Sequence, residues 1–148
     1  IAGRSPKRAV LDSRLSLTQS YQVFKQIEPE TIVLHSNVIK NVKSREGIKY
    51  LGVRENKNGL DVKDVLVKLG RQGITTLLVE GGAEVLKSFY NADVLDEIYV
   101  YTSHSELKNA HLKNPIIIST DWETKKKASF GNNQLKVYKK KEICLLEL

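Results

Sequence analysis

Cysteine, methionine and aromatic residues are scarce in this chain. Its 148 residues include one cysteine, no methionine and 7% aromatic side chains. The single cysteine, Cys144, cannot form an internal disulfide, which favours a reducing compartment. No apolar run approaches the ~20 residues of a membrane span, and no signal-peptide pattern opens the sequence. We therefore expect a cytoplasmic protein that does not interact with a membrane.

Potential metal ligands are equally few. A protein zinc site needs three or four histidine, cysteine or carboxylate ligands brought close together. His35, His104 and His111 are scattered along the sequence, and Cys144 stands alone. The sequence therefore predicts no metal site.

Positive charge is in excess, because 24 Lys and Arg against 17 Asp and Glu give a formal net charge of +7. This excess favours anionic partners such as phosphates or nucleic acid. The lysine runs at 125–127 and 139–141 are typical of solvated surface. Few aromatic residues are present to build the base-stacking platform of single-strand binders. We therefore expect no nucleic acid partner.

The first half of the sequence predicts alternating strands and a helix. Short apolar runs at 8–12, 31–35 and 49–53 are typical of buried strands. Asp61 is expected as the N-cap of a helix that ends at Gly70. With 41% hydrophobic residues, the chain can bury a core. The fold class is therefore α/β, with one domain over residues 1–148.

The second half predicts a parallel crossover followed by antiparallel strands. Residues 74–79 lack alternation, which is typical of a strand covered on both faces. With a helix over 82–91 and a strand at 97–101, they predict a right-handed βαβ unit. We also expect a short strand at 115–118 and a hairpin between 127 and 139, which turns at Gly131.

Glu80, Gly81 and Gly82 join the predicted strand at 74–79 to the helix that follows. The first turn of a helix presents unpaired backbone N–H groups that favour phosphate, and glycine allows a ligand to approach the backbone closely. Glu80 would lie at the carboxyl edge of the sheet, where α/β proteins bind ligands. A tight turn with a solvated Glu80 explains these residues equally well.

Three segments together resemble a known family. Residues 8–14 (RAVLDSR), 77–84 (LLVEGGAE) and 94–97 (VLDE) are similar, in order and spacing, to the reductase domain of bacterial bifunctional riboflavin biosynthesis proteins, the RibD family. The resemblance implies a dihydrofolate-reductase-like fold, which is a three-layer αβα sandwich with a mostly parallel central sheet and a C-terminal antiparallel hairpin. It also implies a homodimer and a deaminase domain in the same parent chain.

The resemblance further implies an NADPH-dependent oxidoreductase. Its substrate would be the phosphorylated pyrimidine 5-amino-6-(5-phosphoribosylamino)uracil, reduced at ribose C1′ to 5-amino-6-(5-phosphoribitylamino)uracil. Because the nicotinamide carries the chemistry, no catalytic residue is assigned. Glu80 corresponds to a substrate contact. The residues expected at the cofactor are Ser13, Gly81, Gly82, Ala83 and Glu84.

Arg14 is added to the cofactor residues on chemical grounds. A guanidinium beside Ser13 could pair with a phosphate in bidentate geometry. An arginine exposed in a loop is the commoner explanation of such a residue. The role of Arg14 therefore stays open at this point.

The sequence departs from the family pattern in two places. After Tyr101 the family continues with a loop that contains proline and glycine, whereas this chain has residues 102–106 (TSHSE). The family domain also begins well upstream of residues 8–14. We therefore expect the C-terminal part of a reductase domain, without a deaminase domain, and the activity of this part alone stays open.

Two alternatives remain for the function. One is a related NADPH reductase that acts on a different pyrimidine or pterin. The other is a non-catalytic basic domain that binds protein or nucleic acid through its lysine runs. Residues 116–118, three isoleucines, fit a dimer surface and a core strand equally well.

Overall fold

The computed structural model describes residues 3, 5–18, 20–105, 108, 109, 111 and 114–141. Cys144 and Glu106, which enter the predictions above, lie outside these residues. The chain forms two compact units, Ile1–Leu78 and Val79–Leu148, each described by itself below. That both units belong to one domain stays a prediction.

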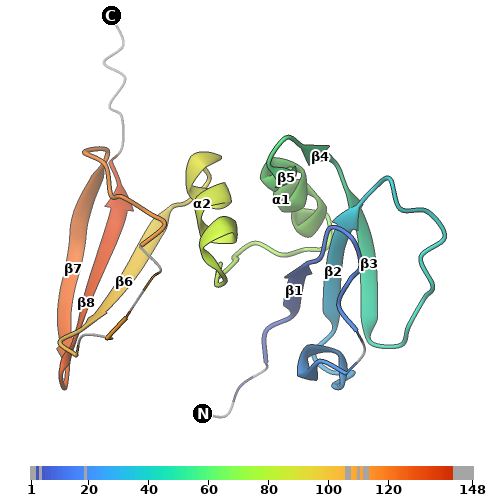
Figure 1. Cartoon of the computed structure of the whole chain (residues 1–148), viewed down its shortest axis with the longest axis horizontal. Helices are drawn as coiled ribbons and strands as arrows, with labels where there is room; N and C mark the ends of the chain where they lie inside the picture. Colours follow the sequence, from blue (N-terminus) through green and yellow to red (C-terminus); the bar gives the residue numbers. More distant parts are fainter. Residues whose placement is uncertain are drawn as a thin grey trace, which may run out of the picture. The chain divides into compact units, whose positions relative to one another are not determined.

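The first unit contains a parallel sheet of three strands in the order β1-β2-β3 (Figure 1). The strands are β1 (Arg8–Leu11), β2 (Thr31–Ser36) and β3 (Ile48–Val53). All six residues of β2 are buried, as expected for the central strand of a parallel sheet. All three predicted strands of the first half are therefore confirmed, with bounds shifted by one residue.

The helix α1 packs against this sheet. α1 (Val62–Gly70) begins at Asp61, whose carboxylate accepts hydrogen bonds from the backbone N–H groups of Lys63 and Asp64. Its apolar face contacts β3 and buries Val65, which is 1% exposed, and Leu69, which is 2% exposed. The predicted cap and the end at Gly70 are both confirmed. Smaller elements are η1 (Gln22–Phe24), β4 (Glu55–Asn56) and β5 (Gly59–Leu60).

Residues 74–79 do not form the predicted strand. Within the described part of the chain, no backbone hydrogen bond joins residues 75–79 to another segment. Leu78 is 75% exposed, although the apolar run suggested burial on both faces. The prediction is wrong because a strand needs hydrogen bonds to a neighbouring backbone, and none of the described segments pairs with this one.

The second unit contains α2 (Ala83–Asn91) and an antiparallel sheet in the order β6-β8-β7. The strands are β6 (Glu97–Ser103), β7 (Trp122–Phe130) and β8 (Asn133–Lys140). The predicted hairpin is confirmed as β7 and β8, and Gly131 takes a positive φ of 56° in its turn. β6 pairs antiparallel with β8, so the predicted parallel βαβ unit is not formed.

The core of the second unit gathers apolar side chains from α2, the sheet and the segment before β7. Its buried members are Phe89, Ile98, Ile116, Leu135 and Val137. Residues 115–118 do not form the predicted strand, since Ile116 is buried but Ile117 is 84% exposed and no ladder forms with a described residue. None of the described helices is long and apolar enough to cross a membrane.

Candidate functional site

The junction before α2 is exposed and is built around two glycines. Gly81 has a φ of 156°, which residues with a side chain rarely adopt, and a Cβ there would lie 3.4 Å from Cβ of Val85. Gly82 has a φ of −68°, and a Cβ there would meet no other atom within 4 Å. The backbone therefore requires glycine at 81, whereas at 82 the missing side chain leaves open space in front of the helix.

The N-terminus of α2 has no side-chain cap. Gly82 is the N-cap residue, and its carbonyl accepts hydrogen bonds from the N–H groups of Val85 at 3.1 Å and Leu86 at 3.3 Å. The N–H groups of Gly82, Ala83 and Glu84 have no hydrogen-bond partner among the described residues. Together with the helix dipole, they form an exposed cluster of donors that can hold an anion.

Two carboxylates lie at this junction, and both are exposed. The Glu80 side chain makes no hydrogen bond or ion pair with a described residue. Its carboxylate is therefore able to accept hydrogen bonds from the N–H or O–H groups of a ligand. The Glu84 carboxylate would repel a phosphate placed directly beside it, so the backbone N–H of Glu84 is the group suited to an anion.

The turn after β1 carries the other predicted residues. The Ser36 N–H donates to the Ser13 carbonyl at 3.0 Å. The Asp12 carboxylate accepts hydrogen bonds from the N–H groups of Ser16 and Leu17, each at 2.9 Å. Burial acts to raise the pKa of Asp12, but these hydrogen bonds outweigh it and hold the pKa below its usual range. Asp12 is thus an ionised residue that fixes the shape of the turn.

Arg14 is exposed at the tip of this turn, and its side chain has no partner among the described residues. The structure therefore brings the predicted residues into two groups. Ser13 and Arg14 share one turn of the first unit, and residues 80–84 share one junction of the second.

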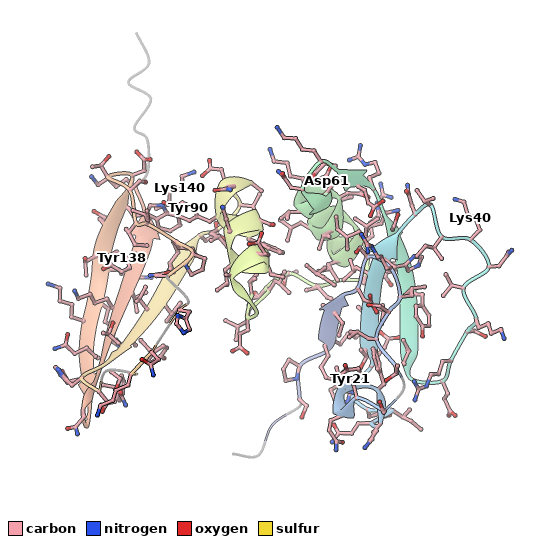
Figure 2. All side chains as sticks on the ribbon, in the orientation of Figure 1. Tyr21, Lys40, Asp61, Tyr90, Tyr138 and Lys140 are labelled. Atoms are coloured by element: carbon pink, nitrogen blue, oxygen red, sulfur yellow. The ribbon has the colours of Figure 1, made fainter. Side chains whose placement is uncertain are left out.

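A cavity of about 490 Å³ in the first unit was missed by the sequence analysis. It lies between the turn after β1 and the connection from β2 to β3, which carries Lys40, labelled in Figure 2. Asp12 and Leu15, which flank Ser13 and Arg14, line it, whereas none of residues 80–84 does. The basic residues Lys40, Lys43 and Arg45 in that connection were the available sequence signal.

Comparison with known proteins places this chain beside riboflavin biosynthesis enzymes. A model of the family described as the RibD C-terminal domain matches residues 2–103. The riboflavin biosynthesis protein RibD of Aquifex aeolicus is 33% identical over 99 residues, which are 66% of this chain and 27% of that protein. The 2,5-diamino-6-ribosylamino-4(3H)-pyrimidinone 5′-phosphate reductase of Archaeoglobus fulgidus is 30% identical over 98 residues, which are 66% of this chain and 44% of that protein.

Solved structures show the same relationship in the fold. A deaminase and 5-amino-6-(5-phosphoribosylamino)uracil reductase of Thermotoga maritima superposes with a TM-score of 0.72 at 18% identity, covering 93% of this chain and 38% of that chain. The riboflavin biosynthesis reductase Rib7 of Saccharomyces gives a TM-score of 0.73 at 14% identity, covering 93% of this chain and 71% of that chain. This chain therefore shares the fold of these proteins, although it spans less than half the length of the two sequence relatives above.

Proposed function

Because the chain belongs to the RibD C-terminal domain family, we propose that it forms part of an NADPH-dependent reductase of riboflavin biosynthesis. The proposed reaction reduces 5-amino-6-(5-phosphoribosylamino)uracil to its ribitylamino product, as the name of the Thermotoga relative suggests. We further propose that residues 1–148 belong to one dihydrofolate-reductase-like domain, that the parent chain carries a deaminase domain, and that the enzyme is a homodimer.

One observation carries this proposal: the uncapped N-terminus of α2 follows directly on Glu80, whose carboxylate has no partner among the described residues. The backbone N–H groups of Gly82, Ala83 and Glu84 have no described partner, and the space in front of Gly82 is empty. Such a group of donors fits the pyrophosphate of a dinucleotide. Gly81 supports this arrangement by allowing the backbone to turn into the helix.

Each residue then has a defined task. Bound NADPH would supply the hydride that reduces ribose C1′. The N–H groups at the start of α2 hold the phosphates, and Glu80 accepts hydrogen bonds from the N–H or O–H groups of the substrate. Ser13 and Arg14 add a hydroxyl and a guanidinium for a second contact with the cofactor. The protein thus mainly aligns the two reactants, which is a large part of catalysis in such enzymes.

The rival reading, a basic nucleic-acid-binding domain, is weakened by the pairing of lysines in the second unit. Lys125 forms an ion pair with Glu97, and Lys140 forms one with Asp93. Glu97 also accepts a hydrogen bond from the Tyr99 hydroxyl at 2.7 Å. These contacts neutralise part of the positive charge that phosphate binding would use.

The test is the Glu80→Gln variant of the full-length gene product, measured by steady-state kinetics and by NADPH fluorescence titration. Glutamine keeps the size of the side chain but removes its charge and one acceptor. We expect about a tenfold rise in the KM of the pyrimidine, about 1.4 kcal/mol, with the Kd of NADPH unchanged. Glu55→Gln, an exposed glutamate of β4, serves as the control. Equal loss of both affinities, or of neither, would contradict the role of Glu80.

A further inference from the structure

Helix α2 is held at its C-terminal end. Its nine residues are all described, and Phe89, in the last turn, is the only one of them that is buried, at 3% exposed. The next residue, Tyr90, is the only residue of α2 whose side chain hydrogen-bonds to another described segment. At the other end of the helix, Gly82 and Glu84 are exposed. The helix therefore has one anchored end and one open end.

The Tyr90 hydroxyl bridges two backbone groups of the segment before β7. It donates a 2.8 Å hydrogen bond to the Ile117 carbonyl and accepts one of 3.3 Å from the Ser119 N–H. The Tyr90 ring also stacks on Trp122, the first residue of β7, with 6.2 Å between the ring centres and 22° between the ring planes. Aromatic rings at this separation attract each other beyond the burial of their surface. Tyr90 thus ties α2 to the segment and to the strand.

The segment that receives this bridge is itself fixed to the sheet of the second unit. Ile116 is buried, at 9% exposed. The Trp122 N–H donates to the Ser119 carbonyl at 3.3 Å. The N–H of Lys141, which directly follows β8, donates to the Asp121 carbonyl at 2.8 Å. The partners of the Tyr90 hydroxyl are therefore held by the strands, and they set the direction in which α2 leaves its anchor.

A small tilt of α2 about its anchored end would displace its open end. At about 1.5 Å per residue, Ala83 lies about 10 Å along the helix axis from Tyr90. A tilt of about 6° at Tyr90 would therefore move the N–H groups of the first turn by about 1 Å. A misplacement of about 1 Å can lower the rate of a reaction about a hundredfold.

We infer that Tyr90 is a positioning residue of the reductase. The inference rests on the proposed function, in which the N–H groups at the start of α2 hold the phosphates of NADPH. The Tyr90 hydroxyl acts through those groups, because it fixes the direction of the helix that carries them. Tyr90→Phe would keep the ring beside Trp122 but would remove both hydrogen bonds of the hydroxyl. The helix would then tilt more freely, and the nicotinamide would align less well with ribose C1′.

The experiment compares Tyr90→Phe with the wild type in the full-length gene product. Steady-state kinetics gives kcat, fluorescence titration gives the Kd of NADPH, and urea unfolding establishes that each protein is folded under the assay conditions. We expect kcat to fall about tenfold and Kd to rise less than about threefold, because the cofactor phosphates can follow a tilted helix whereas the hydride then misses its target. Tyr101→Phe is the matched control, since Tyr101 is 67% exposed and its hydroxyl makes no hydrogen bond with a described residue. The control should keep the wild-type kcat and Kd.

The outcomes separate this inference from the proposed function. Wild-type kcat in a folded Tyr90→Phe protein would overturn the positioning role, while the reductase proposal stands. A higher Kd with unchanged kcat would overturn it as well, because the hydroxyl would then serve cofactor binding and not alignment. An equal loss of kcat in Tyr101→Phe would show that the anchor of α2 has no special part in the reaction. A wild-type protein that neither binds NADPH nor reduces the pyrimidine would remove both proposals.

Discussion

The two glycines at the start of α2 should differ in how the same substitution changes the stability of the protein. In Gly81→Ala, a Cβ would be forced into a backbone with φ of 156° and would lie 3.4 Å from Cβ of Val85. A residue with a side chain in such a conformation costs about 1–3 kcal/mol. In Gly82→Ala, φ is −68° and the new Cβ would meet no atom within 4 Å. Stability should therefore fall only in the first variant.

The magnitude for Gly82→Ala follows from two small opposing effects. Alanine is a poorer N-cap than glycine, which costs about 0.5–1 kcal/mol. It also lowers the entropy of the unfolded chain, which stabilises the fold by about 0.4–1 kcal/mol. The net change in the free energy of unfolding should lie within about 0.5 kcal/mol. The added methyl group, however, stands on a residue whose N–H group the proposal assigns to the cofactor phosphates, and it would enter space that is now open.

Urea unfolding and NADPH titration of both variants test this reasoning. Gly81→Ala should lose about 1–3 kcal/mol of stability. Gly82→Ala should keep wild-type stability but bind NADPH about tenfold more weakly, because a phosphate could no longer approach the backbone. Wild-type NADPH affinity in a stable Gly82→Ala protein would refute the placement of the phosphates at this helix. Equal stability of the two variants would refute the conformational argument.

Three further predictions concern the scaffold. The hydrogen bonds to Asp12 hold its folded-state pKa below the unfolded value, so its stabilising effect is complete above about pH 4 and is lost as the pH falls toward the folded pKa. Asp12→Asn should thus be less stable at pH 7, and its free energy of unfolding should fall less as the pH is lowered. Urea unfolding between pH 2.5 and 7 measures both effects. The same pH dependence of stability in the variant and the wild type would rule out this role. Phe89→Ala should cost about 3–5 kcal/mol because Phe89 is 3% exposed, whereas Phe130→Ala, at a residue 57% exposed, should cost less than about 0.5 kcal/mol; thermal melts that shift alike would contradict the assigned core. Amide hydrogens of residues 75–79 should exchange much faster than those of β2 by mass spectrometry, since β2 is paired on both edges whereas residues 75–79 have no backbone partner among the described segments. Equal protection would show that residues 75–79 are paired in solution.

Local signals explain the parts of the fold that the sequence predicted well. Asp61 could be recognised as a cap because its carboxylate needs only the N–H groups two and three residues ahead. The β7–β8 turn was recognisable because Gly131 readily takes the positive φ that the turn needs. The parallel strands β1, β2 and β3 were recognisable from short apolar runs. For the cap and the turn, the deciding contacts lie within a few residues of the signal, whereas the three strands pair with segments farther away in the sequence.

The residues of the candidate site also differ in whether local sequence signals could indicate them. Glu80, Gly81 and Gly82 were proposed from the sequence because an acid and two glycines precede a predicted helix, and their role stays a prediction. The cavity could not be found in this way, because its walls come from Leu15, Phe24 and Tyr50, which only the fold brings together. Lys40, Lys43 and Arg45 were visible as a basic cluster, but nothing in the sequence showed that they surround an apolar space.

Residues 74–79 show why a correct pattern can still give a wrong strand. An apolar run indicates which side chains favour burial, but a strand also needs hydrogen bonds to a neighbouring backbone. Among the described segments no such partner exists, and Leu78 stays 75% exposed. Exposed apolar side chains and unpaired backbone groups both make this conformation of the segment less favourable in free energy.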